Sequence, residues 1–310
     1  MATLAFFVNQ TGGQISNSNY FYPFVGANVP VSYQPLGLAY FANNDSGGIL
    51  QAGGLAAETV ITATLPIVIQ AQPLFGSMTV VARTAPVTVF GGFGDIVVAN
   101  GSATGSLVVG GLGNTTVSGG TGSITAFGAS GSSLLVGGSA GGNVLVGGSG
   151  FATLIGGGSG DLLFATNLAL GTRQVLSAGG GNETLVGGGT TQGNTYFAGN
   201  NAAGVTANTV IGAGVGNDTI FAGTGNATVD GGAGADLVAI VNGRAGGAVL
   251  VNGFDAGSGD RITLQGYAPG AVQAAVASSV AGAAGVTVTL SDNTRITFGG
   301  LARIDAGAFV

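Results

Sequence analysis

The chain has 310 residues, of which 64 are glycine and only 7 are proline, and it carries a net charge of −6. Hydrophobic residues make up 45% and charged residues 6%, which excludes a disordered chain, while the scarcity of proline excludes collagen. Histidine and cysteine are absent and all six basic residues are arginine, so disulfides, Cys/His zinc sites and catalytic centres built on histidine, cysteine or lysine are excluded. We therefore expect that the protein is not an enzyme, and the negative charge argues against a nucleic-acid partner.

Residues 1–86 differ from the rest of the chain because they hold six of the seven prolines and many of the aromatic residues. Two segments here are strand-like, VITATLPIVIQ at 60–70 and SMTVVARTAPVTVF at 77–90. This pattern predicts a non-repetitive N-terminal β module. The first ten residues lack the basic and long apolar parts of a secretory signal. No apolar run reaches the ~18 residues of a membrane helix, so we expect no transmembrane segment.

A nine-residue repeat begins at Gly101 and predicts a glycine-rich solenoid over residues 87–248. Contiguous units include GSATGSLVV, GGLGNTTVS, GGTGSITAF and GASGSSLLV, and the clearest units lie at 213–239. The eighth position is apolar almost throughout: Val108, Val117, Ala126, Leu135, Leu145, Leu154, Leu163, Leu185, Ile220, Val229 and Val238. Glycine-rich turns alternating with short strands indicate a β-roll in which two units form one 18-residue coil and coils stack as parallel strands ~4.8 Å apart. The predicted fold is therefore an all-β parallel β-roll or β-solenoid with an N-terminal β module and a C-terminal β cap.

Two segments carry a family resemblance, GNDTIF at 216–221 and GGAGADLVA at 231–239. They resemble the RTX family of glycine-rich nonapeptide repeats, also called hemolysin-type calcium-binding repeats. The resemblance implies that the aspartate at position six binds Ca²⁺ together with backbone carbonyls of stacked turns. It therefore predicts a calcium site formed by residues 18 apart on one edge: Asp218 and Asp236, with the turns that contain Gly214, Gly216, Gly232 and Gly234. The alternative is that each aspartate only caps its turn.

Most units depart from the RTX pattern at position six. Asp161 is an exception, and it faces Asn143 at the same 18-residue spacing, which predicts a weaker second site. Elsewhere the position holds Ser106, Thr115, Ile124, Ser133, Asn143, Ala152, Glu183 and Ala227. We therefore expect calcium at only one or two sites, with most coils held by backbone hydrogen bonds and the apolar ladder.

Residues 249–310 change character again. The segments DRITLQGY (260–267) and TLSDNTRITFGG (289–300), with the terminal DAGAFV, are similar to the ends of RTX proteins exported by type I secretion. The resemblance implies an uncleaved C-terminal signal and a secreted protein, extracellular or at the cell surface. The alternative is that strands at 286–290 and 295–298 cap the solenoid. We expect surface ion pairs between arginines and nearby aspartates: Arg261, Arg295 and Arg303 with Asp260, Asp292 and Asp305.

The small share of charged residues predicts a surface of small and apolar groups, which is poorly defended against self-association. The favoured function is a self-assembling extracellular structural protein, such as a filament, matrix or surface-layer subunit, whose partner is a second copy of the chain. The alternative is a monomeric calcium-binding adhesin in which residues 1–86 bind a cell-surface glycan. An ice-binding solenoid ranks last because a Thr-x-Thr motif does not recur in register.

Overall fold

The computed structural model of the chain describes residues 5–9, 39–43, 49–52, 58–62, 66–71, 76–166, 172–199, 208–243 and 247–310. The chain divides into two compact units, the first unit Met1–Ala152 and the second unit Thr153–Val310. Nearly all of the regular structure is β, and the one α-helix is short (α1, Ala271–Ala277) within these residues. Among them, no helix is long and apolar enough to cross a membrane.

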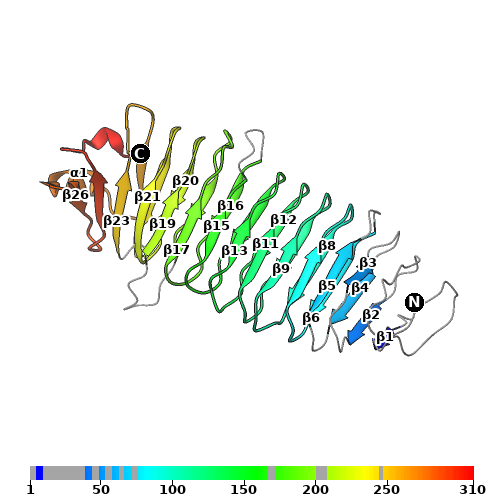
Figure 1. Cartoon of the computed structure of the whole chain (residues 1–310). Helices are drawn as coiled ribbons and strands as arrows, with labels where there is room; N and C mark the ends of the chain where they lie inside the picture. The colour runs from blue at the N-terminus through cyan, green and yellow to red at the C-terminus, as the bar shows by residue number, and fades with distance from the viewer. Residues whose placement is uncertain are drawn as a thin grey trace. The chain divides into compact units, whose positions relative to one another are not determined.

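In the first unit, successive strands alternate between two parallel sheets (Figure 1). The even sheet has the order β1-β2-β4-β6-β8-β10-β12, and the odd sheet has the order β3-β5-β7-β9-β11-β13. The strands are β1 (Ala5–Asn9), β2 (Ala39–Asn43), β3 (Ile49–Ala52), β4 (Glu58–Thr62), β5 (Ile67–Ala71), β6 (Met78–Ala82), β7 (Val87–Phe90), β8 (Ile96–Asn100), β9 (Ser106–Val109), β10 (Thr115–Ser118), β11 (Ile124–Phe127), β12 (Ser133–Val136) and β13 (Val144–Val146).

The second unit repeats this alternation, with an even sheet β14-β16-β18-β20-β22-β24 and an odd sheet β15-β17-β19-β21-β23-β27-β26-β25. Its strands are β14 (Ala152–Ile155), β15 (Leu162–Phe164), β16 (Gln174–Ser177), β17 (Glu183–Val186), β18 (Thr195–Phe197), β19 (Asn208–Gly212), β20 (Thr219–Phe221), β21 (Asn226–Asp230), β22 (Leu237–Val241), β23 (Ala248–Asn252), β24 (Arg261–Gln265), β25 (Val280–Gly282), β26 (Gly285–Thr289) and β27 (Arg295–Gly299). The odd sheet ends with a change of direction, because β27 is parallel to β23 but antiparallel to β26.

The predicted β-solenoid is confirmed. Ser106 pairs with Ile124 and Thr115 with Ser133, so each coil here is 18 residues long, as the repeat predicts. Every apolar residue predicted at position eight is at most 2% exposed and lies in the narrow core between the two sheets. The turns need glycine because coils stack backbone against backbone: a Cβ placed on Gly111 would collide with the carbonyl oxygen of Gly92.

The strands before residue 87 also stack in parallel, although their sequence shows no nonapeptide. Ala39 pairs with Thr59 and Ile67 with Val87, so these coils are 20 residues long. Strands on both sides of residue 86 lie in the same ladders, since β6 pairs with β8 and β5 with β7. The domain boundaries at residues 86 and 248 stay predictions.

The end of the chain is folded onto the second unit. Phe309 forms a parallel bridge with Ile262 of β24, and the backbone N–H of Val310 donates to the carbonyl of Ile262 at 2.9 Å. Ile304, Ala308 and Phe309 are buried. The roles of this segment as a secretion signal and as a cap stay predictions.

Candidate functional site: a column of buried carboxylates

The side chains at position six point into the solenoid, at the corner where a turn enters a strand. Residues six and eight of a unit are two apart in a strand, so they face the same side. Five carboxylates in the second unit occupy this corner or its equivalent, each at most 7% exposed: Asp161, Glu183, Asp218, Asp236 and Asp260. Buried carboxylates are costly unless they are hydrogen-bonded, protonated or paired with a cation.

Three of these carboxylates form a hydrogen-bonded column along the even sheet. The Oδ1 atom of Asp236 accepts the backbone N–H of Asp218 at 2.8 Å, and the Oδ1 atom of Asp260 accepts that of Asp236 at 2.9 Å. The Oδ1 atom of Asp218 in turn accepts the backbone N–H of Asn194. Each side chain therefore ties its own coil to the preceding one, and the predicted proximity of Asp218 and Asp236 is confirmed.

Sequence reasoning missed Asp260 as a member of this column. Its spacing from Asp236 is 24 residues rather than 18, because the intervening coil is longer. The segment GSGD at 257–260 retains part of the repeat and was the available signal. The surface ion pair predicted for Asp260 is wrong, since its side chain is 7% exposed and lies in the column.

Two turns beside the column have an unusual backbone. Gly214 and Gly216 have φ of 102° and 101°, and Gly232 and Gly234 have φ of 84° and 143°, values that strongly favour glycine. The turns stack directly, with the N–H of Ala233 donating to the Gly214 carbonyl and the N–H of Gly216 donating to the Ala233 carbonyl, both at 2.9 Å. The glycines of the predicted calcium site therefore lie together, one turn above the other.

Asp218 and Asp236 differ from other inward side chains in their second oxygen. The Oδ2 atom of Asp260 accepts the N–H of Asp255 at 2.8 Å, and the Oδ2 atom of Asp161 accepts the N–H of Gly157. The Oδ2 atoms of Asp218 and Asp236 are buried and have no hydrogen-bond partner. Because these two coils also contain the left-handed glycine turns, the turn conformation and the free oxygens coincide. An unsatisfied buried oxygen calls for a proton or a cation.

The electrostatics of the corner lead to the same requirement. Burial raises the pKa of Asp218 to about 7, and the charge of Asp236 adds to this rise while the Asn194 N–H opposes it. Burial also raises the pKa of Asp236 to about 6, with the charges of Asp260 and Asp230 adding to the effect. Near neutral pH the two carboxylates are therefore only partly ionised unless a cation compensates them.

The donor atoms at this corner fit the chemistry of calcium. Calcium takes six to eight oxygen ligands, including carboxylates and backbone carbonyls. Within the described part of the chain, no group of three or more acidic side chains is arranged to hold a metal ion. A cation between Asp218 and Asp236 would therefore need carbonyls of the two glycine turns as further ligands.

Asp161 has a carboxylate neighbour that the sequence did not suggest. Its backbone N–H donates to the Oε2 atom of Glu183 at 3.2 Å. Burial raises the pKa of Glu183 to about 8, and the charge of Asp161 adds to the rise. The 22-residue spacing hid this pair. The predicted pairing of Asp161 with Asn143 joins the two units and stays a prediction.

The other predicted ion pairs have different outcomes. Arg303 and Asp305 lie 3.5 Å apart and are both exposed, so this pair is confirmed. Asp292 instead accepts a hydrogen bond from the Tyr267 hydroxyl at 2.7 Å and another from the Thr294 N–H. Its role is therefore to hold the loop after β26, where an ion pair with Arg295 had been predicted.

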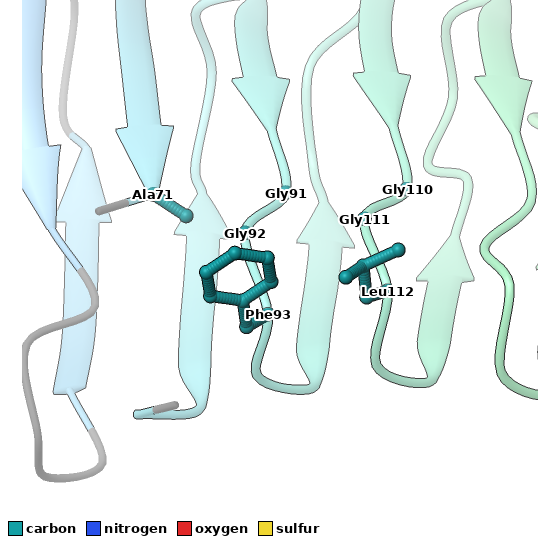
Figure 2. Close-up of a pocket in the computed structure, with 7 residues that line it drawn as sticks. All are labelled: Ala71, Gly91, Gly92, Phe93, Gly110, Gly111 and Leu112. Atoms are coloured by element: carbon teal, nitrogen blue, oxygen red, sulfur yellow. The ribbon is translucent and has the colours of Figure 1, made fainter. Parts of the chain in front are cut away.

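A shallow groove of about 420 Å³ lies at the turns after β7 and β9 in the first unit (Figure 2). Phe93 and Leu112 flank it, and the remaining lining is alanine and glycine: Ala71, Gly91, Gly92, Gly110 and Gly111. Coil stacking explains its glycine floor, because a Cβ on Gly91 would lie 2.6 Å from the backbone nitrogen of Gly111. The groove contains no group that would perform chemistry.

No family model, curated protein or solved structure matches the chain. The RTX resemblance and the calcium site that it implies therefore stay predictions.

Proposed function

We propose that the protein is a secreted structural protein whose copies associate side by side outside the cell, with a solenoid that calcium stabilises at Asp218 and Asp236. The observation that carries this proposal is the absence of charge on the outward faces of the first unit. Sixteen outward positions of β6–β13 hold only neutral residues: Thr79, Val81, Val97, Ala99, Thr116, Ser118, Leu134 and Val136 on the even sheet, and Thr88, Phe90, Leu107, Val109, Thr125, Phe127, Val144 and Val146 on the odd sheet. A soluble protein that remains monomeric normally covers such faces with charged side chains.

The exposed apolar residues of these faces favour contacts with another copy. Val97 and Leu134 are 41% and 40% exposed on the even sheet, and Phe127 is 39% exposed on the odd sheet. Contiguous exposed apolar surface is typical of an interaction site. Since the fold offers no catalytic group, a structural role accounts for more of the molecule than an enzymatic one.

Calcium supports the extracellular part of the proposal. The free Oδ2 atoms of Asp218 and Asp236 are buried acceptors that a divalent cation would satisfy. Where free calcium is scarce, two buried carboxylates disfavour folding of these coils. Millimolar calcium outside the cell would bind the folded state and shift the equilibrium toward it.

Negative-stain electron microscopy of the full chain, refolded with millimolar calcium or with a chelator, tests the proposal. We expect ordered filaments or sheets in calcium and their loss in chelator. Ordered polymers in both conditions would retain the structural role and overturn the role of calcium. Dispersed monomers in both conditions would overturn self-assembly and favour the alternative of a glycan-binding module.

A further inference from the structure

The outward face of the odd sheet in the first unit carries two columns of side chains in register. One column runs Thr88, Leu107, Thr125 and Val144, and the other runs Phe90, Val109, Phe127 and Val146. The four strands that carry them, β7, β9, β11 and β13, are adjacent and parallel. We call this surface the Phe face.

Large and small rungs alternate along the Phe face. The strands β7 and β11 each present a threonine and a phenylalanine, whereas β9 and β13 present two aliphatic residues. Phe90 and Phe127 are 36% and 39% exposed, while Val109 and Val146 are half-buried between and beside them. Because neighbouring strands are ~4.8 Å apart, the phenylalanine ridges recur about every 10 Å, with a lower valine rung between them.

From this corrugation we infer that the Phe face binds the Phe face of a second copy, displaced by one rung so that the ridges of each copy enter the valine rungs of the other. The inference rests on the proposed self-assembly and names the surface that performs it. A two-coil period is self-complementary under such a shift, because every ridge then meets a lower rung. Aromatic rings packed in this way are shielded from water, which is the main driving force of association.

The distribution of charge favours a second copy as the occupant. The chain carries a net charge of −6, so two copies repel one another wherever their acidic residues meet. The Phe face holds no charged side chain, so two copies meet here without juxtaposing like charges. At the edge of this face, Phe93 and Leu112 are 40% and 57% exposed and extend the apolar surface along the groove of Figure 2.

The size of the face determines the kind of assembly. Four strands at ~4.8 Å spacing and four residues at ~3.3 Å rise give a surface of about 250 Å² per copy. A stable pair of proteins buries about 800 Å² per partner. One Phe-face contact is therefore weak, and it contributes to an ordered array in which other uncharged faces also make contacts.

A charge placed on the Phe face tests the inference. Phe127→Asp puts a carboxylate on a ridge, and Val97→Asp on the even sheet is the matched control because the two positions are 39% and 41% exposed. We expect Phe127→Asp to raise the concentration at which wild-type polymers form at least tenfold, measured by light scattering, and Val97→Asp to change it less than threefold. Circular dichroism and thermal melting verify that both variants fold.

Each outcome of this experiment has a separate meaning. If the wild type polymerises and Phe127→Asp polymerises equally well, the Phe face is not the interface, although the proposed function stands. An equal loss in both variants would also overturn the inference, because it would show no preference for this face. If the wild type does not polymerise, the proposed function and the inference both fail.

Cysteine cross-linking tests the displacement by one rung, and the natural absence of cysteine makes single-cysteine variants clean probes. Thr125→Cys labels a ridge rung and Leu107→Cys labels a lower rung. In polymers mixed from the two variants, one of them tagged to change its mass, we expect 107–125 cross-links to exceed 125–125 cross-links at least threefold. Equal yields, or an excess of 125–125 cross-links, would contradict the interlocked arrangement.

Discussion

Single side chains connect the coils from both sides of each turn. On the inner side, the Oδ1 atom of Asp236 accepts the N–H of Asp218 from the preceding coil. On the outer side, the asparagine at position five does the same, since the Asn114 and Asn217 side chains accept the N–H groups of Ser132 and Ala235 at 2.8 and 2.9 Å. Any acceptor of suitable length serves this purpose, which explains how serine, asparagine or glutamate replaces aspartate in coils that are not expected to bind calcium.

The buried carboxylates predict that the metal-free protein is less stable at pH 8 than at pH 5. The pKa values of Asp236, Asp218 and Glu183, about 6, 7 and 8, lie above the ordinary value of about 4 for an unfolded carboxyl group. The folded state then binds more protons, so this contribution to stability is complete below about pH 4 and is lost as the pH rises through 6 to 8. We expect the melting temperature in chelator to fall by several degrees between pH 5 and pH 8. A melting temperature that is constant or rises over this range would contradict the burial of these groups.

Replacing Asp236 by asparagine separates its two roles. Asn143 shows that an amide fits the corner, because its oxygen accepts two backbone N–H groups and its nitrogen donates to the Gly138 carbonyl at 2.8 Å. In chelator at pH 8 we expect Asp236→Asn to stabilise the protein by about 1–2 kcal/mol, since it removes a buried charge and retains the hydrogen bond. Calcium should no longer raise its melting temperature.

The control for this substitution is Asp95→Asn. The Asp95 side chain also accepts a backbone N–H from the next coil, that of Asn114, but it is exposed. Thermal melts of the two variants with and without calcium should therefore differ. If Asp95→Asn and Asp236→Asn respond alike, or if Asp236→Asn retains the calcium response, the Asp218–Asp236 corner does not bind the ion.

At the scale of the element, the turn limits how closely coils stack. Glycines that face another turn have no space for a side chain, whereas others face open space. A Cβ on Gly111 would overlap the Gly92 carbonyl, whereas a Cβ on Gly180 would have no atom within 4 Å. Glycine is therefore required at particular turn positions rather than throughout the repeat.

This difference predicts the effects of two matched substitutions. We expect Gly111→Ala to destabilise the protein by about 1–3 kcal/mol, because the coils on either side must separate. Gly180→Ala should change stability by less than about 0.5 kcal/mol, since its space is open and its φ is not positive. Urea denaturation of both variants measures the difference. Equal effects would show that the coils are not packed as closely as the structure indicates.

At the scale of the whole molecule, the second unit shows how a solenoid ends. Its odd sheet reverses direction at β26, and its even sheet ends at β24, where the residues Phe309 and Val310 pair with Ile262. An uncovered parallel edge invites the addition of another strand. The C-terminal segment therefore hinders end-to-end joining here and leaves the outward faces as the surfaces for association.

Deletion of residues 304–310 should expose the edge of β24. We expect the shortened protein to form larger species than the wild type at the same concentration, as measured by size-exclusion chromatography with light scattering. Phe309→Ala, which removes only the 8% exposed ring, should lower stability by about 3–5 kcal/mol without this growth, because the backbone pairing persists. Unchanged species after the deletion would show that the edge does not require cover.

The sequence by itself determined the solenoid of the repeat region and its core. A nine-residue period with an apolar eighth position has one low-energy arrangement, because two units close one coil and the apolar side chains then form a single buried ladder. The pairing of Asp218 with Asp236 followed for the same reason, since their spacing of 18 residues equals one coil.

Only the tertiary structure decided the rest of the candidate site and the extent of the coils. Asp260 and Glu183 join their neighbours across 24 and 22 residues, spacings that depend on how much chain each turn accommodates. The strands before residue 87 stack in 20-residue coils without the glycine signature. The free oxygens of Asp218 and Asp236 arise because left-handed turns direct their N–H groups elsewhere. A local pattern specifies regular coils, whereas irregular ones are aligned only by the sheets that they join.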